Sequence, residues 1–199
     1  MKKIAVLISN AGIGTNLQSI INGISDGKIK GEIVVVVSDK KGAYGLQRAK
    51  KNKLKTEICV KKEDLFRLLK RYAPDFICLT GWKQIILDTV IDEYPGRILN
   101  VHPGLIPDTT DGFVKNPDGT KALWNKGKFT EKAIQNFLDE KKTYAGSSIT
   151  TLTHEFDFGP VITRGFVKIK PGDTVDSLYG RLKKKENKIY AKALIELCK

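Results

Sequence analysis

Short apolar runs alternate with amphipathic helical patterns through the first half of the sequence, and this alternation restricts the possible folds more than any other feature. The strand-like runs have the apolar, partly β-branched character of strands buried on both faces, and they span residues 3–9, 32–38, 56–60, 75–80 and 97–101. Apolar residues at helical spacing separate them, at residues 16–24, 43–52 and 62–72. Strands that alternate with helices predict right-handed βαβ units around a parallel sheet.

The second half of the sequence has a different pattern. Residues 115–143 are rich in Lys, Asn, Asp and Gly, with one helix-like piece at 131–139. Two strand-like runs, 147–152 and 161–169, flank a turn and predict a hairpin. A long amphipathic helix is predicted at 173–197.

The length of 199 residues suits one domain, so we expect residues 1–199 to form a single α/β domain. Its first half, residues 1–102, would hold the βαβ units of a mostly parallel central sheet flanked by helices. Its second half, residues 103–199, would hold an insertion, an antiparallel C-terminal extension of the sheet and the last helix.

Composition and charge narrow the class of protein. The sequence is 41% hydrophobic and 29% charged, which is enough to bury a core, and no apolar run approaches the roughly 20 residues of a membrane-spanning helix. The apolar stretch at residues 4–8 is too short for a signal peptide. The three cysteines have neither metal nor disulfide spacing, so we expect a cytoplasmic protein without a metal. The formal net charge of +13 favours an anionic partner: nucleic acid, a phosphorylated metabolite or a polyglutamylated cofactor. We interpret Lys183, Lys184 and Lys185 as a solvated helix face.

A glycine-containing loop, residues 9–16, joins the first predicted strand to the first predicted helix. Its glycines allow a sharp turn, and the helix offers free N–H groups and its positive dipole end to a phosphate. The third glycine of the dinucleotide-binding fingerprint is missing. Gly14, Thr15 and Asn16 are therefore candidates for a phosphate site, and a tight connection without a ligand is the alternative.

Two motifs further along carry groups for acid–base chemistry. Asn100 and His102 lie two residues apart at the end of a predicted parallel strand, where α/β sheets place ligands. A neutral histidine can take up a proton near pH 7, and an asparagine amide can donate a hydrogen bond to a developing oxyanion. Asp157 stands in a turn and can orient a histidine. The alternatives are a hydrogen-bonded core histidine and an ordinary hairpin turn, and His154 fits a turn residue better than a metal ligand. Together, the loop and the two motifs predict group transfer to or from a phosphorylated small molecule.

Four stretches of the sequence are distinctive as a set. They are LIS…GIGTNLQSII near the start, LTGW at residues 79–82, GRILNVHPGLIP at 96–107 and HEFDFGPVI at 154–162. The set resembles the phosphoribosylglycinamide formyltransferases of the folate-dependent formyltransferase family. The resemblance implies a Rossmann-like formyltransferase fold and the transfer of a formyl group from 10-formyltetrahydrofolate to the amine of glycinamide ribonucleotide, a step of de novo purine biosynthesis.

The resemblance also implies roles for individual residues. Asn100 would polarise the formyl carbonyl, and His102 would carry a proton between the attacking amine and the leaving folate nitrogen. Asp157 would hold His102, directly or through an ordered water. The expected acceptor-binding residues are Gly14, Thr15 and Asn16 at the phosphate and Glu186 at the ribose or glycinamide end. The expected folate-binding residues are Trp82, Lys83, Gln84, Ile85, Ile86, Thr153, His154, Glu155, Phe156 and Asp157.

The sequence leaves several alternatives open. The acceptor could be another amine, such as an amino-sugar nucleotide, and methionyl-tRNA fits less well because that group generally carries an added C-terminal domain. A non-catalytic nucleic-acid-binding domain is the alternative from another class, although the lysines lack aromatic interleaving. We favour small-molecule substrates, with no membrane partner and a monomer or homodimer. The long segment 107–143 is either a lid or a surface insertion, and Lys61 or Lys62 would stand in for the arginine that the family uses for the folate tail.

Overall fold

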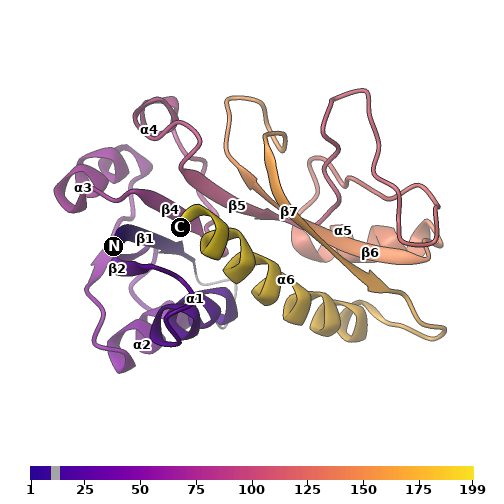
Figure 1. The fold of residues 1–199 in the computed structure, drawn as a ribbon, viewed down its shortest axis with the longest axis horizontal. Coiled ribbons are helices and arrows are strands. Elements are labelled where there is room, and N and C mark those ends of the chain that lie inside the picture. Colours follow the sequence, from indigo (N-terminus) through magenta and orange to yellow (C-terminus); the bar gives the residue numbers. More distant parts are fainter. Residues whose placement is uncertain (10–13) are drawn as a thin grey trace.

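The computed structural model describes residues 1–9 and 14–199, and its central element is one seven-stranded sheet (Figure 1). The strands are β1 (Lys2–Ile8), β2 (Gly31–Ser38), β3 (Thr56–Ile58), β4 (Phe76–Leu79), β5 (Ile98–His102), β6 (Tyr144–Thr151) and β7 (Val161–Lys168). The helices are α1 (Thr15–Ser25), α2 (Tyr44–Lys51), the 3₁₀ turn η1 (Lys62–Asp64), α3 (Leu65–Tyr72), α4 (Asp88–Glu93), α5 (Thr130–Asp139) and α6 (Val175–Leu197).

Strand directions follow the prediction: β1 to β5 pair in parallel, whereas β6 runs antiparallel to β5 and β7 antiparallel to β6. Across the sheet the order is β3-β2-β1-β4-β5-β6-β7, so the chain changes direction at β1, with β2 on one side and β4 on the other. At such a switch point the loops after adjacent strands turn to opposite faces. They leave a crevice at the carboxyl edge, where open α/β sheets bind ligands.

Helices cover both faces of the parallel strands. Ile4 and Val6 of β1 belong to a core that also contains residues of α1, α2 and α6. The alternate residues Ala5 and Leu7 belong to a second core, with residues of α3 and α4. All four side chains are fully buried, which explains why β1 is a continuous apolar run without alternation.

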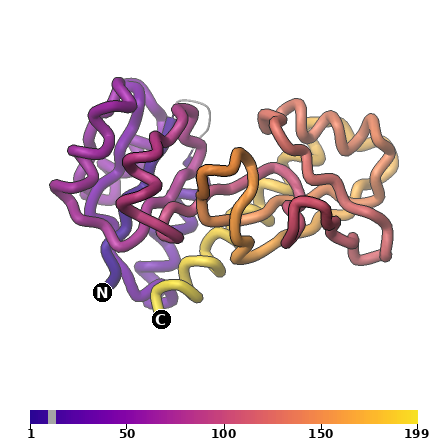
Figure 2. Tube along the Cα trace, turned by 90° about the horizontal axis from the view of Figure 1, so that it is seen from above, coloured from indigo at the N-terminus to yellow at the C-terminus, as the bar shows by residue number. Residues whose placement is uncertain are grey.

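The long helix α6 connects the two halves of the chain. It contacts α1 at one end and α5, β6 and β7 along its length, and its C-terminus returns to the side of the molecule that holds the N-terminus (Figures 1 and 2). Tyr190 is fully buried, and its hydroxyl lies 3.3 Å from the backbone oxygen of Leu79 and 3.1 Å from that of Leu99. The helix is thereby held to both β4 and β5.

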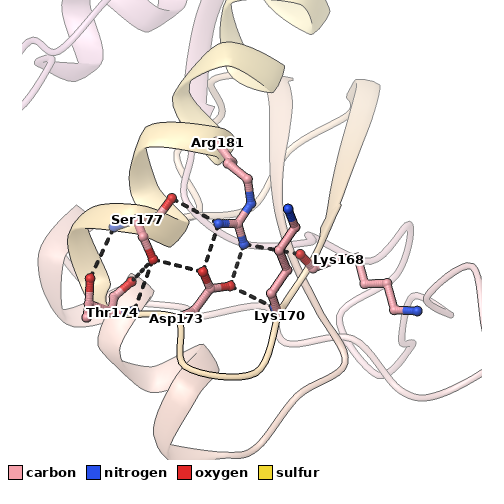
Figure 3. Close-up of polar contacts among 6 residues, drawn as sticks. All are labelled: Lys168, Lys170, Asp173, Thr174, Ser177 and Arg181. Atoms are coloured by element: carbon pink, nitrogen blue, oxygen red, sulfur yellow. Dashed lines mark hydrogen bonds and ion pairs between the residues drawn. The ribbon is translucent and has the colours of Figure 1, made fainter.

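Figure 3 shows how α6 begins. Thr174 and Ser177 form a capping box, in which each side chain bonds the backbone N–H of the other. The carboxylate of Asp173 accepts hydrogen bonds from Arg181 and from the N–H of Lys170. The Arg181 guanidinium holds the pKa of the Asp173 carboxyl well below its usual range.

The predicted elements differ from the structure mainly in short pieces. Helix α4 was not predicted, because its six residues give too little periodicity. The predicted strand 56–60 ends at Ile58, since β3 lies at the sheet edge and pairs with β2 alone. The predicted helix 62–72 starts as the 3₁₀ turn η1. Residues 10–13 of the predicted glycine loop lie outside the described residues.

Candidate active site

A cavity of about 670 Å³ opens at the carboxyl edge of the sheet, beside the switch point at β1. Its walls come from the start of α1, the segments after β4 and β5, the β6–β7 loop and α6. The expected catalytic and acceptor-binding residues all line it: Gly14, Thr15, Asn16, Asn100, His102, Asp157 and Glu186. A second depression of about 610 Å³, beside β3 and α3, contains none of them.

His102 and Asp157 lie next to each other in the cavity lining. His102 ends β5 and is only 2% exposed, and its Nδ1 lies 3.5 Å from Oδ1 of Asp157. The other carboxylate oxygen of Asp157 accepts a 2.7 Å hydrogen bond from the N–H of Gly127. Burial alone would raise the pKa of Asp157, but the His102 ring, the N–H of Gly127 and the charge of Lys126 outweigh it, so that pKa lies below its ordinary value. The contact between carboxylate and ring is direct.

The backbone around Asp157 is tightly turned. Asp157 has a φ of 52°, a left-handed conformation that aspartate adopts more readily than most residues. Gly159 follows at a point where an added Cβ would lie 2.1 Å from the carbonyl oxygen of Thr151. The loop therefore requires glycine at residue 159 in order to direct Asp157 towards His102.

Asn100 precedes His102 by two residues and also lines the cavity. β5 pairs with β4 on one side and with β6 on the other, so neighbours fix the strand along both edges. Because strand side chains alternate between the two faces, this pairing holds Asn100 and His102 on a common face.

The start of α1 has features that fit the phosphate site predicted from the glycine loop. Gly14 is the N-cap, with a φ of 71°, and no side chain among the described residues caps the helix. Asn16 is 2% exposed, and within the described residues neither polar atom of its side chain has a hydrogen-bond partner. The hydroxyl of Thr15 is likewise buried and unpartnered there. Buried polar groups are normally satisfied, so these atoms indicate a polar ligand at the helix N-terminus.

Residues of helix α6 also line the cavity. The carboxylate of Glu186 is 3% exposed and accepts hydrogen bonds from Ser147 Oγ at 2.9 Å and Lys183 Nζ at 2.8 Å. Of the three lysines expected to form a solvated helix face, Lys184 is exposed, whereas Lys183 is only 30% exposed, lines the cavity and departs from that expectation. Burial opposes its charge, but Glu186 more than compensates and raises the pKa of Lys183. Asn187 was not predicted, yet its buried Oδ1 has no partner in the described part of the chain, and it too lines the cavity.

The long segment 107–143 contributes directly to the site. Its residues Gly127, Lys128, Phe129 and Thr130 line the cavity. The backbone oxygen of Trp124 lies 2.7 Å from Nε2 of His102. The sequence around Trp124 does not predict this contact, because the contact joins a loop residue to a strand end 22 positions earlier in the chain.

The expected folate-binding residues divide into two groups. Trp82, Lys83, Phe156 and Asp157 line the cavity, and the indole N–H of Trp82 is buried without a partner among the described residues. The others lie outside the lining: Gln84, Ile85, Ile86, Thr153, His154 and Glu155. His154, for example, lies between two carboxylates, with its Nδ1 3.2 Å from Asp88 Oδ1 and its Nε2 3.0 Å from Asp92 Oδ1, and the hydrogen bonds that its ring donates to them raise its pKa. Ile86 packs in the core, and Glu155 pairs with Lys126.

Neither a metal cluster nor a membrane span is found in the part of the chain that the structure describes. No three His, Cys, Asp or Glu side chains come together there in a group that could hold a metal ion. Likewise, no helix among these residues is long and apolar enough to cross a membrane.

Known proteins resemble this chain along nearly its whole length. A curated phosphoribosylglycinamide formyltransferase of Escherichia coli is 33% identical over 94% of the chain, which spans 82% of that protein. A chloroplastic phosphoribosylglycinamide formyltransferase of Arabidopsis thaliana is 28% identical, and the chain spans 65% of its length. The chain spans only 18% of a trifunctional purine biosynthetic protein of Gallus gallus, to which it is 31% identical.

Solved structures agree with these relatives. A glycinamide ribonucleotide transformylase from Symbiobacterium toebii superposes with a TM-score of 0.82 and 32% identity, over 98% of this chain and 86% of that one. The family model described as formyl transferase matches residues 2–194. The chain therefore belongs to the formyl transferase family.

Proposed function

We propose that this protein transfers a formyl group from 10-formyltetrahydrofolate to the amine of glycinamide ribonucleotide, as in de novo purine biosynthesis. The observation that carries the proposal is the shared cavity, in which Asn100, His102 and Asp157 lie with an uncapped helix N-terminus and the unsatisfied Asn16 side chain. The names of the relatives in Escherichia coli and Arabidopsis thaliana support the same activity.

The chemistry follows from three side chains. Bound 10-formyltetrahydrofolate would supply a formyl carbon already activated towards an amine. Asn100 donates its amide hydrogen to the formyl oxygen and stabilises the negative charge that develops there. His102 takes the proton that the attacking amine releases and returns it to the departing folate nitrogen as the carbon–nitrogen bond breaks. Asp157 orients the ring and stabilises its charged form, since its carboxylate lies 3.5 Å from Nδ1.

The two ends of the cavity hold the two substrates in this proposal. Gly14, Thr15 and Asn16 bind the acceptor phosphate through the helix N-terminus and the unpartnered side-chain atoms. Glu186 bounds the ribose or glycinamide end, with its charge balanced by Lys183.

The folate end fits Trp82, Lys83 and Phe156. Trp82 offers a partly exposed indole with an unsatisfied N–H, and Phe156 offers an exposed phenyl ring, which suit a flat, polar heterocycle. The ammonium group of Lys83 suits an anionic tail. Two of the remaining residues of these stretches hold loop backbone instead: Gln84 donates to the carbonyl oxygen of Val60, and Thr153 donates to that of Phe158.

We further propose that residues 1–199 act as a single formyltransferase domain in the cytoplasm, as a monomer or homodimer. The continuous seven-stranded sheet supports one domain. Three buried cysteines with free thiols suit a reducing compartment.

Formyl transfer to purified acceptors tests the proposal. We expect turnover with glycinamide ribonucleotide and 10-formyltetrahydrofolate, and kcat/KM at least about 100-fold lower with an amino-sugar nucleotide, whose amine and phosphate are spaced differently. His102→Ala should lower the rate by about 100-fold or more while the protein stays folded. Turnover of the sugar nucleotide alone would refute the assigned acceptor, and full activity of His102→Ala would refute the assigned mechanism.

A further inference from the structure

Residues 123–127, here called the crossing segment, contact both members of the His102–Asp157 pair. The backbone oxygen of Trp124 lies 2.7 Å from His102 Nε2, and the indole N–H of Trp124 donates to the backbone oxygen of Asp157 at 3.0 Å. The N–H of Gly127 donates to Asp157 Oδ2 at 2.7 Å. Three hydrogen bonds from five consecutive residues therefore connect a strand end with a loop 55 positions later in the chain.

Asn125 anchors the crossing segment. It is 5% exposed and has a φ of 60°, a left-handed conformation that asparagine tolerates. Its amide donates to the backbone oxygens of Pro103 and Ala133, at 3.0 and 3.2 Å, and its Oδ1 accepts from Asn136 at 2.8 Å. Every hydrogen-bonding group of this side chain is thus used within the protein, which fixes the peptide whose carbonyl faces His102.

The fit between the crossing segment and the strand end is close. An added Cβ at Gly104 would lie 1.7 Å from the backbone oxygen of Trp124 and 3.0 Å from His102 Nε2. Glycine at this position therefore lets the carbonyl of Trp124 reach the ring.

The contact selects one form of the imidazole ring. A carbonyl oxygen can only accept a hydrogen bond, so the His102 nitrogen that faces Trp124 must carry hydrogen. In the neutral ring only one nitrogen carries hydrogen, and two acceptors compete for it. The Trp124 oxygen lies 2.7 Å from Nε2, whereas Asp157 Oδ1 lies 3.5 Å from Nδ1, so the shorter contact assigns the hydrogen to Nε2. The nitrogen that gains and loses a proton is then Nδ1, beside Asp157.

We propose that Trp124 and Asn125 are positioning residues for the formyl transfer proposed above: the crossing segment fixes the tautomer and orientation of His102 and its distance from Asp157. The proposal rests on that function for its kinetic consequence only. The tautomer itself can be measured without any substrate.

Two variants remove the contacts one at a time. Trp124→Phe deletes the indole donor to Asp157 and keeps an aromatic ring against Phe158, whose centroid lies 5.7 Å away. Asn125→Gly deletes the anchoring amide and retains a residue that adopts positive φ without strain. Asn116→Gly is the matched control, since Asn116 is a buried asparagine of the same long segment whose amide binds Thr120, away from the site.

The first measurement is the state of the ring. Nitrogen-15 chemical shifts at about pH 9, where an ordinary imidazole is neutral, report the tautomer, and His154→Gln assigns the signals because the chain has two histidines. We expect His102 in the Nε2–H form in the wild type and in Asn116→Gly, and a mixture of tautomers in Asn125→Gly. A wild-type His102 in the Nδ1–H form, or an unchanged signal in Asn125→Gly, would overturn the proposal.

The second measurement is the kinetics of formyl transfer. We expect Trp124→Phe and Asn125→Gly to lower kcat about 10-fold, with KM for both substrates changed less than twofold and Asn116→Gly at the wild-type rate. An equal loss of kcat in Asn116→Gly would identify a general folding effect and refute a positioning role. Absence of turnover by the wild type would refute the proposed function. The tautomer measurement would still test whether the crossing segment fixes the His102 ring.

Discussion

Replacement of Asp157 by asparagine tests how much the negative charge of the carboxylate stabilises the charged form of His102. The amide keeps the size of the side chain but removes the negative charge 3.5 Å from Nδ1. For two unit charges at that distance and an effective dielectric constant of about 20, Coulomb's law gives about 5 kcal/mol. The Asp157 side chain is 16% exposed, so water screens part of this energy, and we expect a loss of about 2–3 kcal/mol of transition-state stabilisation when His102 becomes charged.

That energy corresponds to a decrease in kcat of about 30- to 150-fold. The measurement is the initial rate of formyl transfer with both substrates saturating, together with the melting temperature as a control for folding. Asp26→Asn is a suitable control variant, because Asp26 is a surface residue that pairs with Lys28, and its replacement should leave kcat unchanged.

The pH dependence gives an independent check with a defined sign. The pKa of Asp157 lies below its ordinary value, so the contribution of its carboxylate is present at neutral pH and is lost as the pH falls through that lowered pKa. The ratio of wild-type to Asp157→Asn rates should therefore decrease as the pH falls below about 4, where the wild-type carboxylate is protonated. A rate of the variant within threefold of the wild type at neutral pH, or a ratio that does not decrease below about pH 4, would refute the reasoning.

Three further changes test the supporting structure. Gly104→Ala should displace the crossing segment, because its Cβ would lie 1.7 Å from the Trp124 oxygen. We expect the free energy of unfolding to fall by about 3 kcal/mol or more in urea denaturation. An unaltered urea midpoint would contradict the close packing at Gly104. Asp173→Asn should lower the free energy of unfolding by about 1.5–3 kcal/mol at pH 7, because it weakens the hydrogen bonds to Arg181 and to the Lys170 N–H. Since the pKa of Asp173 is lowered on folding, the difference should shrink as the pH falls below about 4, and a constant difference would be inconsistent with this sign. Lys183→Met should lower the free energy of unfolding by about 2–3 kcal/mol, because it leaves the Glu186 carboxylate buried without its cation. Adding Glu186→Gln should restore most of this stability in thermal unfolding. Additive losses of stability from the two changes would contradict the pairing.

The sequence predicts much of the fold because local patterns determine it. The apolar run of β1 predicts a strand covered on both faces, and the order of strands and helices predicts the parallel sheet. The position of Asn100 and His102 at the cavity could be predicted in the same way, since a strand end, a spacing of two and their chemistry are all visible along the chain. Asp157 is in the same group, because a turn with glycine and proline exposes an acid in a defined place.

The rest of the site depends on contacts between distant segments. Trp124 reaches His102 through a backbone carbonyl, and no side-chain pattern encodes such a contact. Lys183 looks solvated beside two other lysines, yet it lies three residues before the buried Glu186 and pairs with it. Asn187 is ordinary in a helix until the fold brings its Oδ1 to the cavity wall without a partner.

The position of the positively charged side chains also helps to decide between nucleic acid and a small molecule as the binding partner. The formal net charge is +13, and the cavity receives lysines from several elements, namely Lys83, Lys128, Lys183 and Lys184. Lys183 is matched by Glu186, so the excess at the cavity rests on the other three and on the positive end of α1. The polar group to be satisfied at that end, the Asn16 side chain, is only 2% exposed. A phosphate on a nucleic-acid backbone is too encumbered to reach an atom so enclosed, whereas the terminal phosphate of a small metabolite can enter the cavity. The same charge that permits nucleic-acid binding on composition alone therefore favours a small phosphorylated acceptor once the fold is known.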